Sequence, residues 1–413
     1  MSNLNATPSA SRIQIAIFGR RNAGKSSLMN ALTNQQIALV SEEPGTTTDP
    51  VFKSMELLPL GPVVFIDTAG LDDIGALGEL RIKRSYDVLD RTDLALLVID
   101  CQIGLTEFET KLTQVIRQKN IPTVAVINKV DLKPLSLEQK QKWQEQLQMD
   151  VVEISASSGT GISQLKTALI RNAQRIEEEP FLVGDLIHPG DLAILVIPID
   201  KAAPKGRLIL PQQQVIRDIL EHDGTAVVTK EYELKETLEN LKRPPAIVIT
   251  DSQVFLKVAA DTPREIPLTS FSILFARQKG DLAQLMAGAG AVETLQPGDQ
   301  VLIAEGCTHH RQSDDIGTVK IPRWLRQTVG GELNFTWSSG QSLPEDLNRF
   351  KLVIHCGGCM LNRREMMSRL TMAKNQAIPI VNYGVLIAYL QGIFPRALEP
   401  FPEAEAFFES KLH

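Results

Sequence analysis

The segment Gly19-Arg20-Arg21-Asn22-Ala23-Gly24-Lys25-Ser26 follows an apolar run and precedes a helical pattern that begins Ser27-Leu28. It matches the phosphate-binding pattern G-x-x-x-x-G-K-[ST]. In this pattern the glycines let backbone amides turn toward phosphate oxygens, and the N-terminus of the next helix adds partial positive charge. We therefore expect Lys25 to reach the β- and γ-phosphates and the Ser26 hydroxyl to bind magnesium. The expected phosphate contacts are completed by Gly19, Asn22, Ala23, Gly24 and Ser27.

Short apolar runs alternate with helical patterns on both sides of this loop. In the first part of the chain the runs occupy 13–19, 63–70, 94–100, 123–131 and 151–156. This alternation predicts an α/β fold with a mainly parallel sheet. The same alternation returns at 182–262 and again at 263–413, so we expect three α/β domains. The first would occupy residues 12–178, after a disordered lead-in at 1–11.

Composition limits the classes of function. The net charge is −6, which disfavours nucleic acid as the main partner because such binding relies on basic surfaces. A small basic patch at Arg363, Arg364 and Arg369 is interpreted as a solvated helix face. No apolar run is long enough to span a membrane and the first residues do not read as a secretory signal, so we expect a cytoplasmic protein without a membrane partner.

Three further motifs identify the nucleotide. Asn128-Lys129-Val130-Asp131 follows a strand and matches the guanine-reading N-K-x-D element, in which the Asp131 carboxylate accepts hydrogen bonds from guanine N1 and N2. Ser155-Ala156 matches the short element whose backbone contacts guanine O6. Asp67-Thr68-Ala69-Gly70 matches D-x-x-G, with Asp67 acting on magnesium through water and the Gly70 amide facing the γ-phosphate. Together these motifs predict binding of GTP with magnesium, and its hydrolysis.

Two features depart from the Ras-like pattern. Leu71 stands where Ras-like enzymes carry the glutamine that orients water. Asn22 and the switch segment 43–49 resemble the TrmE–Era–Obg class, in whose potassium-activated members such an asparagine helps to hold a monovalent cation against the phosphates. The resemblance implies potassium-stimulated turnover. It also makes Thr47 the best candidate for the switch threonine on magnesium, with Thr46 and Thr48 next, so that Lys25, Asn22, Thr47 and Gly70 form the expected catalytic set.

Cysteines and histidines gather in the last third of the chain, in Cys307-Thr308-His309-His310 and His355-Cys356-Gly357-Gly358-Cys359. Both segments follow apolar strand patterns, so we expect both at the carboxyl edge of one parallel sheet, where ligands bind in open α/β folds. Three cysteines fit an iron–sulfur cluster, a zinc site or a redox pair. His309 and His355 are candidate ligands, and His310 is expected beside the site or on the surface. Cys101, alone after a strand, is interpreted as structural.

The combination of a potassium-type GTPase with the C-x-H and H-C-x-x-C segments resembles the HydF family, the GTPases that mature [FeFe]-hydrogenase. The resemblance implies a dimerisation or coupling domain at 182–262 and an iron–sulfur domain at 263–413. It further implies a [4Fe-4S] cluster bound by Cys307, Cys356 and Cys359, on which the di-iron subcluster is assembled or from which it is delivered. A homodimer is implied, and the implied partners are the radical S-adenosylmethionine maturases HydE and HydG and apo-[FeFe]-hydrogenase.

Two other interpretations stay open on the residues alone. One is an Era- or TrmE-type GTPase associated with RNA or the ribosome, with the cysteines holding structural zinc. The other is a redox-sensing GTPase in which Cys356 and Cys359 cycle as a dithiol.

Overall fold

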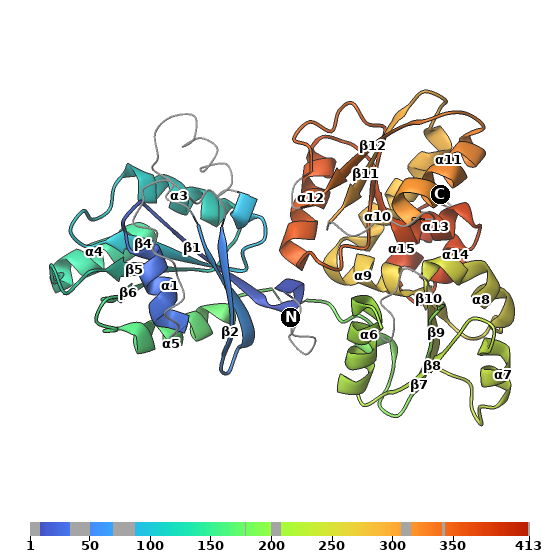
Figure 1. Cartoon of the computed structure of the whole chain (residues 1–413), viewed down its shortest axis with the longest axis horizontal. Helices are drawn as coiled ribbons and strands as arrows, with labels where there is room; N and C mark the ends of the chain where they lie inside the picture. Colours follow the sequence, from blue (N-terminus) through green and yellow to red (C-terminus); the bar gives the residue numbers. More distant parts are fainter. Residues whose placement is uncertain are drawn as a thin grey trace. The chain divides into compact units, whose positions relative to one another are not determined.

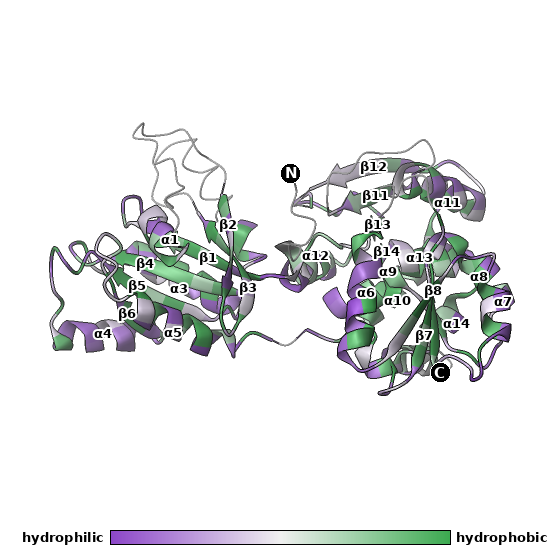
Figure 2. Cartoon of the chain, turned by 60° about the horizontal axis from the view of Figure 1, so that its bottom comes forward, coloured by the Kyte–Doolittle hydropathy of each residue, from purple (hydrophilic) through white to green (hydrophobic). Residues whose placement is uncertain are grey.

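The computed structural model describes residues 9–33, 50–68, 87–177, 179–199, 208–306, 315–340 and 343–411. It divides into two compact units, Met1–Glu178 and Glu179–His413, each built from parallel strands and helices (Figure 1). In both units the apolar residues lie along the strands and the polar residues lie on the outer helical surfaces (Figure 2). None of the helices in the described ranges has the length and apolar character needed to cross a membrane.

The first unit contains one six-stranded sheet with the order β2-β3-β1-β4-β5-β6. Its strands are β1 (Ile13–Gly19), β2 (Val51–Leu57), β3 (Gly61–Asp67), β4 (Leu94–Asp100), β5 (Thr123–Asn128) and β6 (Asp150–Glu153). All neighbours are parallel except β2, which runs antiparallel to β3. Strand β2 was not expected from the sequence because this edge strand is mostly exposed and lacks a continuous apolar run.

Helices cover both faces of this sheet. They are α1 (Lys25–Thr33), α3 (Glu107–Gln118), α4 (Leu137–Leu147) and α5 (Ile162–Ala173). The buried residues of α1 and α5 share one core with one face of the strands, whereas those of α3 and α4 pack on the other face. Of the expected lead-in at 1–11, the described part is a 3-10 turn at Ser9–Ser11 in which Ala10 is buried.

The second unit contains two four-stranded, fully parallel sheets, ordered β10-β9-β7-β8 and β12-β11-β13-β14. The first comprises β7 (Leu192–Val196), β8 (Thr225–Thr229), β9 (Ile247–Thr250) and β10 (Leu268–Ser270). The second comprises β11 (Gln300–Glu305), β12 (Asn334–Ser339), β13 (Leu352–His355) and β14 (Ile380–Asn382). The expected division at 262/263 therefore falls before β10, a strand of three residues that is too short to give a periodic signal.

A single hydrophobic core runs through the second unit and joins its two sheets. Its helices are α6 (Leu210–Glu221), α7 (Leu234–Glu239), α8 (Phe255–Asp261), α9 (Phe271–Lys279), α10 (Leu282–Gly290), α11 (Ile321–Val329), α12 (Arg363–Asn375), α13 (Tyr383–Leu390), α14 (Phe394–Leu398) and α15 (Pro402–Lys411). Short helical turns occupy Gly184–Leu186, Ser252–Val254, Ala291–Thr294 and Ile316–Lys320. Helix α9 follows β10 directly and contacts α6, α10, α12 and α13, so it packs against elements of both sheets.

Candidate nucleotide and metal sites

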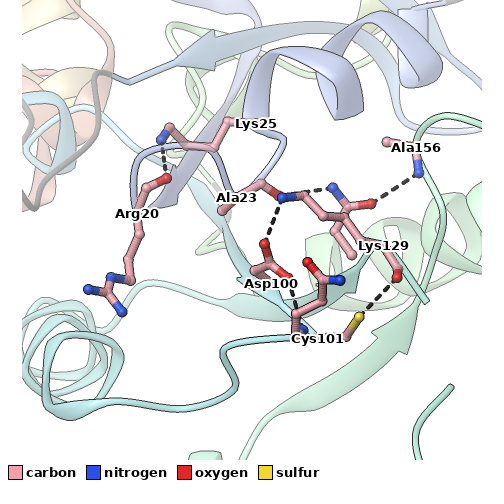
Figure 3. Close-up of polar contacts among 9 residues, drawn as sticks. Arg20, Ala23, Lys25, Asp100, Cys101, Lys129 and Ala156 are labelled. Atoms are coloured by element: carbon pink, nitrogen blue, oxygen red, sulfur yellow. Dashed lines mark hydrogen bonds and ion pairs between the residues drawn. The ribbon is translucent and has the colours of Figure 1, made fainter. Parts of the chain in front are cut away.

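The predicted phosphate-binding loop joins β1 to α1, and the side chain of Lys25 bonds back to carbonyl oxygens of this loop. Lys25 is 8% exposed, and its Nζ donates to the Gly19 carbonyl at 2.9 Å. It also donates to the Arg20 carbonyl at 2.8 Å (Figure 3). Gly24 has a φ of +93°, and a Cβ there would lie 2.2 Å from Nδ2 of Asn128. Asn22 also has a left-handed φ of +60°. The backbone is therefore shaped around the space in which we expect phosphates.

Asn128, at the end of β5, ties the base-reading segments to the phosphate loop. Its Nδ2 donates to the Ala23 carbonyl at 2.9 Å, and its Oδ1 accepts from the Ala156 N–H at 3.0 Å (Figure 3). Ser155, just before, is buried and its N–H donates to the Thr160 carbonyl at 3.0 Å. One amide side chain thus connects three of the predicted motifs, with contacts that span 105 residues to Ala23 and 28 residues to Ala156.

Lys129 pairs with a residue that the sequence analysis did not single out. Its Nζ lies 2.6 Å from Oδ2 of Asp100, the last residue of β4, which is 8% exposed. The sequence contained a signal for this ion pair, because Asp100 ends the strand that lies parallel to the strand carrying Asn128. Cys101 is buried and its thiol donates to the Lys129 carbonyl at 2.9 Å, a structural role. Asp131 is exposed, so its carboxylate is accessible for the predicted contact with guanine.

Ser26 and Asp67, which the sequence predicts on the magnesium side of the site, are in contact. The Ser26 hydroxyl donates to Oδ2 of Asp67 at 2.6 Å. Burial raises the pKa of Asp67, and its Oδ1 is buried without a hydrogen-bond partner among the described residues. A hydroxyl beside a buried carboxylate oxygen with unused acceptor capacity fits a hard divalent cation. Ser27 is exposed on the first turn of α1.

Several predicted site residues lie outside the described ranges, and their roles stay predictions. They are Thr46, Thr47, Thr48, Ala69, Gly70, Leu71, Cys307, His309 and His310.

The second cysteine segment follows β13 at the carboxyl edge of its sheet. The Cys356 N–H donates to the Ala304 carbonyl of β11 at 2.9 Å, and Sγ of Cys356 accepts from the Gly306 N–H at 3.1 Å. Gly306 immediately precedes Cys307 in the sequence. Burial raises the pKa of Cys359, which is partly exposed. Within the described ranges no three His, Cys, Asp or Glu side chains are grouped as a metal site.

A buried lysine lies under this loop and was not predicted from the sequence. Lys279, the last residue of α9, is 2% exposed. Its Nζ donates to the carbonyl oxygens of Leu361 at 2.7 Å, Cys359 at 3.3 Å and Gly358 at 3.4 Å. Burial lowers its pKa, and the nearby charges of Glu179, Cys359, Cys356 and Glu365 oppose that shift.

Family models cover most of the chain. Residues 182–280 match the hydrogen maturase F dimerization domain, and residues 283–400 match the hydrogen maturase F tetramerization domain. Residues 14–129 match a GTPase model described as a 50S ribosome-binding GTPase. The chain belongs to the hydrogen maturase F family. Its first unit is a GTPase domain. The two domains that follow match family models described as a dimerization domain and a tetramerization domain.

Curated relatives resemble only part of this hydrogen maturase F chain. The tRNA modification GTPase MnmE of Nitrosomonas europaea is 35% identical over 162 residues, covering 39% of this chain and 35% of the relative. GTPase Der of Persephonella marina is 38% identical over 166 residues, covering 37% of each. The chain spans about a third of the length of these relatives. A crystal structure of Era from Aquifex aeolicus shares 20% identity, with a TM-score of 0.36 over 55% of this chain and 97% of that one.

His355 is held by its neighbours in this hydrogen maturase F chain. It is fully buried, its Nδ1 lies 2.7 Å from the Cys356 carbonyl and its Nε2 lies 2.8 Å from Nη1 of Arg369. Burial and then the charge of Arg369 lower the pKa of His355 to about 3. The imidazole is therefore neutral with both nitrogens bonded, so a role for His355 as iron ligand requires loss of the Arg369 contact.

The basic patch on α12 is not the solvated face that the sequence analysis expected. Arg369 is 4% exposed, and its Nη2 donates to the Gly340 carbonyl at 2.9 Å and lies 3.3 Å from Oε1 of Glu365. Nη1 of Arg363 donates to the carbonyls of Gln278 at 2.6 Å and Gly280 at 3.2 Å. These arginines pack inward because carbonyls and a carboxylate within the unit satisfy their charge.

Proposed function

We propose that this chain is a GTP-hydrolysing scaffold or carrier for the maturation of [FeFe]-hydrogenase. It holds a [4Fe-4S] cluster on Cys307, Cys356 and Cys359, and assembles or delivers the di-iron subcluster. The observation that carries the proposal is the union, in one chain, of a GTPase domain with two hydrogen maturase F domains and a cysteine loop.

In the GTPase domain each residue has a separable task. Asp131 accepts hydrogen bonds from guanine, while Asn128 holds the base-reading segment against the phosphate loop. Lys25 turns from its loop carbonyls toward the phosphates, Ser26 and Asp67 hold magnesium with Thr47, and the Gly70 amide faces the γ-phosphate. Bound magnesium neutralises phosphate charge. Catalysis then rests on positioning and on charge stabilisation in the transition state.

Asn22 completes the catalytic group through a monovalent cation. Asn22 has a left-handed backbone and precedes Ala23, whose carbonyl accepts a hydrogen bond from Nδ2 of Asn128. A cation there supplies charge that Leu71 cannot. We expect GTP turnover to rise several-fold in potassium chloride relative to sodium chloride at equal ionic strength. Equal rates in the two salts would contradict this role, and Asn22→Ala should lose the potassium effect.

In the second unit the thiols carry the metal. The chemistry of the donors fits thiolate ligation, because Cys356 Sγ already accepts a backbone N–H and a buried ammonium lies under the loop. A cluster with three cysteine ligands keeps one iron open to exchange. That open position gives HydE, HydG and apo-hydrogenase a place at which cargo joins or leaves, on a chain that acts as a homodimer.

Anaerobic reconstitution with iron and sulfide tests the proposal. We expect about four irons per chain by the cluster's stoichiometry, with an EPR signal in the reduced form. Cys307→Ser should lose iron and signal, whereas Cys101→Ser, a buried thiol of the GTPase domain, should keep both. Stoichiometric zinc without iron uptake would overturn the proposal in favour of a GTPase with a structural zinc site.

A further inference from the structure

Two cations join the loop that carries Cys356 and Cys359 to the end of α9: Lys279, which is distant in the sequence, and Arg363, which directly follows the loop. Lys279 donates to three carbonyls of the loop, across 79 to 82 residues. Arg363, just after the loop, donates to the carbonyls of Gln278 and Gly280, the two neighbours of Lys279. Each side of the contact therefore donates to the backbone of the other.

Burial of the Lys279 ammonium has an unfavourable desolvation free energy. Its side chain is 2% exposed, and its Nζ also lies 5.3 Å from the centre of the Phe275 ring. Removing an ammonium from water costs several kcal/mol even after relaxation, and carbonyl dipoles repay this only in part. One of the three acceptors of Lys279, Gly358, lies between the two cysteines and has a left-handed φ of +64°.

We propose that Lys279 is a positioning residue of the metal site, an inference that rests on the proposed function. Its three carbonyl bonds hold the segment 356–361 in the shape that presents both thiolates. Its positive charge offsets the negative charge of a thiolate-bound cluster and therefore stabilises the reduced cluster relative to the oxidised one. The charge and hydrogen bonding around a cluster are the protein's main means of setting its reduction potential.

The test compares reconstituted wild-type protein with Lys279→Met, which keeps the apolar stem and removes the charge. In Lys279→Met we expect half of the bound iron to be removed at a concentration of a ferrous-iron chelator about 10-fold or more below that needed for the wild type. The midpoint potential of the remaining cluster, measured by EPR titration, should become more negative. Lys374→Gln, which removes a positive charge from an exposed position of α12, should leave both quantities unchanged.

The outcomes separate this inference from the proposed function. Failure of the wild type to take up iron would overturn both. Iron uptake by wild type, with the same chelator resistance and midpoint in Lys279→Met, would overturn the role of Lys279 alone. If Lys279→Met does not fold, Lys279→Arg decides the question, because it keeps the charge and changes the donor geometry. It should bind iron less tightly at an unchanged midpoint, and a shifted midpoint would contradict the charge role.

Discussion

The phosphate loop of the first unit and the cysteine loop of the second unit are built alike. Each follows a parallel strand, precedes a helix and curves around a buried lysine that donates to loop carbonyls. Lys25 binds the carbonyls of Gly19 and Arg20, and Lys279 binds those of Gly358, Cys359 and Leu361. In both cases a buried ammonium bonds to the backbone of the loop in which we predict a binding site.

The two loops differ in where the lysine comes from. Lys25 lies five or six residues from its acceptors, so loop and lysine form one motif that a sequence displays. Lys279 comes from another helix, and only the packing of α9 against α12 brings it to the loop. We expect Lys25 to turn toward the phosphates of a bound nucleotide. Lys279 is 2% exposed, and we expect it to stay bonded to the carbonyls of the cysteine loop.

Among the substitutions that distinguish the phosphate loop from the cysteine loop, we expect Lys25→Met to have the largest effect. GTP hydrolysis should fall by about 10²–10³-fold, because a charged donor to the transition state is removed. Steady-state phosphate release measures this effect. Iron uptake by the same variant should equal that of the wild type, since Lys279 and the cysteines are unchanged. Loss of iron in Lys25→Met would show that the two loops are not independent.

Acid should affect the two units differently. All six histidines follow residue 179, and buried His355 has a pKa of about 3 when folded. The unfolded chain binds this proton below about pH 6.5, so stability from His355 is present above that pH and is lost as the pH falls toward 3. Between pH 7 and pH 5 the loss is about 2 kcal/mol of unfolding free energy. The raised pKa of Asp67 acts in the opposite direction in the first unit, where protonation favours the folded state.

Urea unfolding followed by tryptophan fluorescence measures the difference. In a Trp143→Phe background the remaining tryptophans, Trp324 and Trp337, both lie in the second unit. We expect His355→Gln to lose less stability than its parent between pH 7 and pH 5. An identical loss in both would show that burial and the charge of Arg369 do not keep this imidazole neutral.

The smallest expected effect concerns the glycine between the two cysteines. Gly358→Ala should lower the unfolding free energy by about 1–2 kcal/mol, because an L-residue is strained at a φ of +64°. Its Cβ would also lie 2.4 Å from the flexible end of Met366. Gly330→Ala is the control, since it has a φ of +71° and no atom within 4 Å. Both should lower stability in urea, but only Gly358→Ala should weaken iron retention. Equal retention would contradict a loop held in one shape.

The sequence predicted what is local. Alternating apolar runs predicted the α/β fold and five of the six strands of the first unit, namely β1, β3, β4, β5 and β6. The sequence also displays the nucleotide motifs, but not the contacts that Asn128 and Lys25 make in the structure. It did not predict β2, whose residues are exposed, or β10, which has three residues. Asp100, Lys279 and Arg369 were missed or misread because a charged side chain reads as solvated until tertiary packing supplies its partners.

The cysteine loop can adopt its folded shape only after both Lys279 and Arg363 have been synthesised, because these residues make the contact between the loop and α9. This requirement sets an order of folding during translation. The first unit is complete at residue 178, so the nucleotide can bind while the remainder is still being translated. The loop needs Lys279 and Arg363, and its sheet gains β14 only at Ile380–Asn382. The complete loop, with its contact to Lys279 and its four-stranded sheet, can therefore form only after residue 382 has been synthesised.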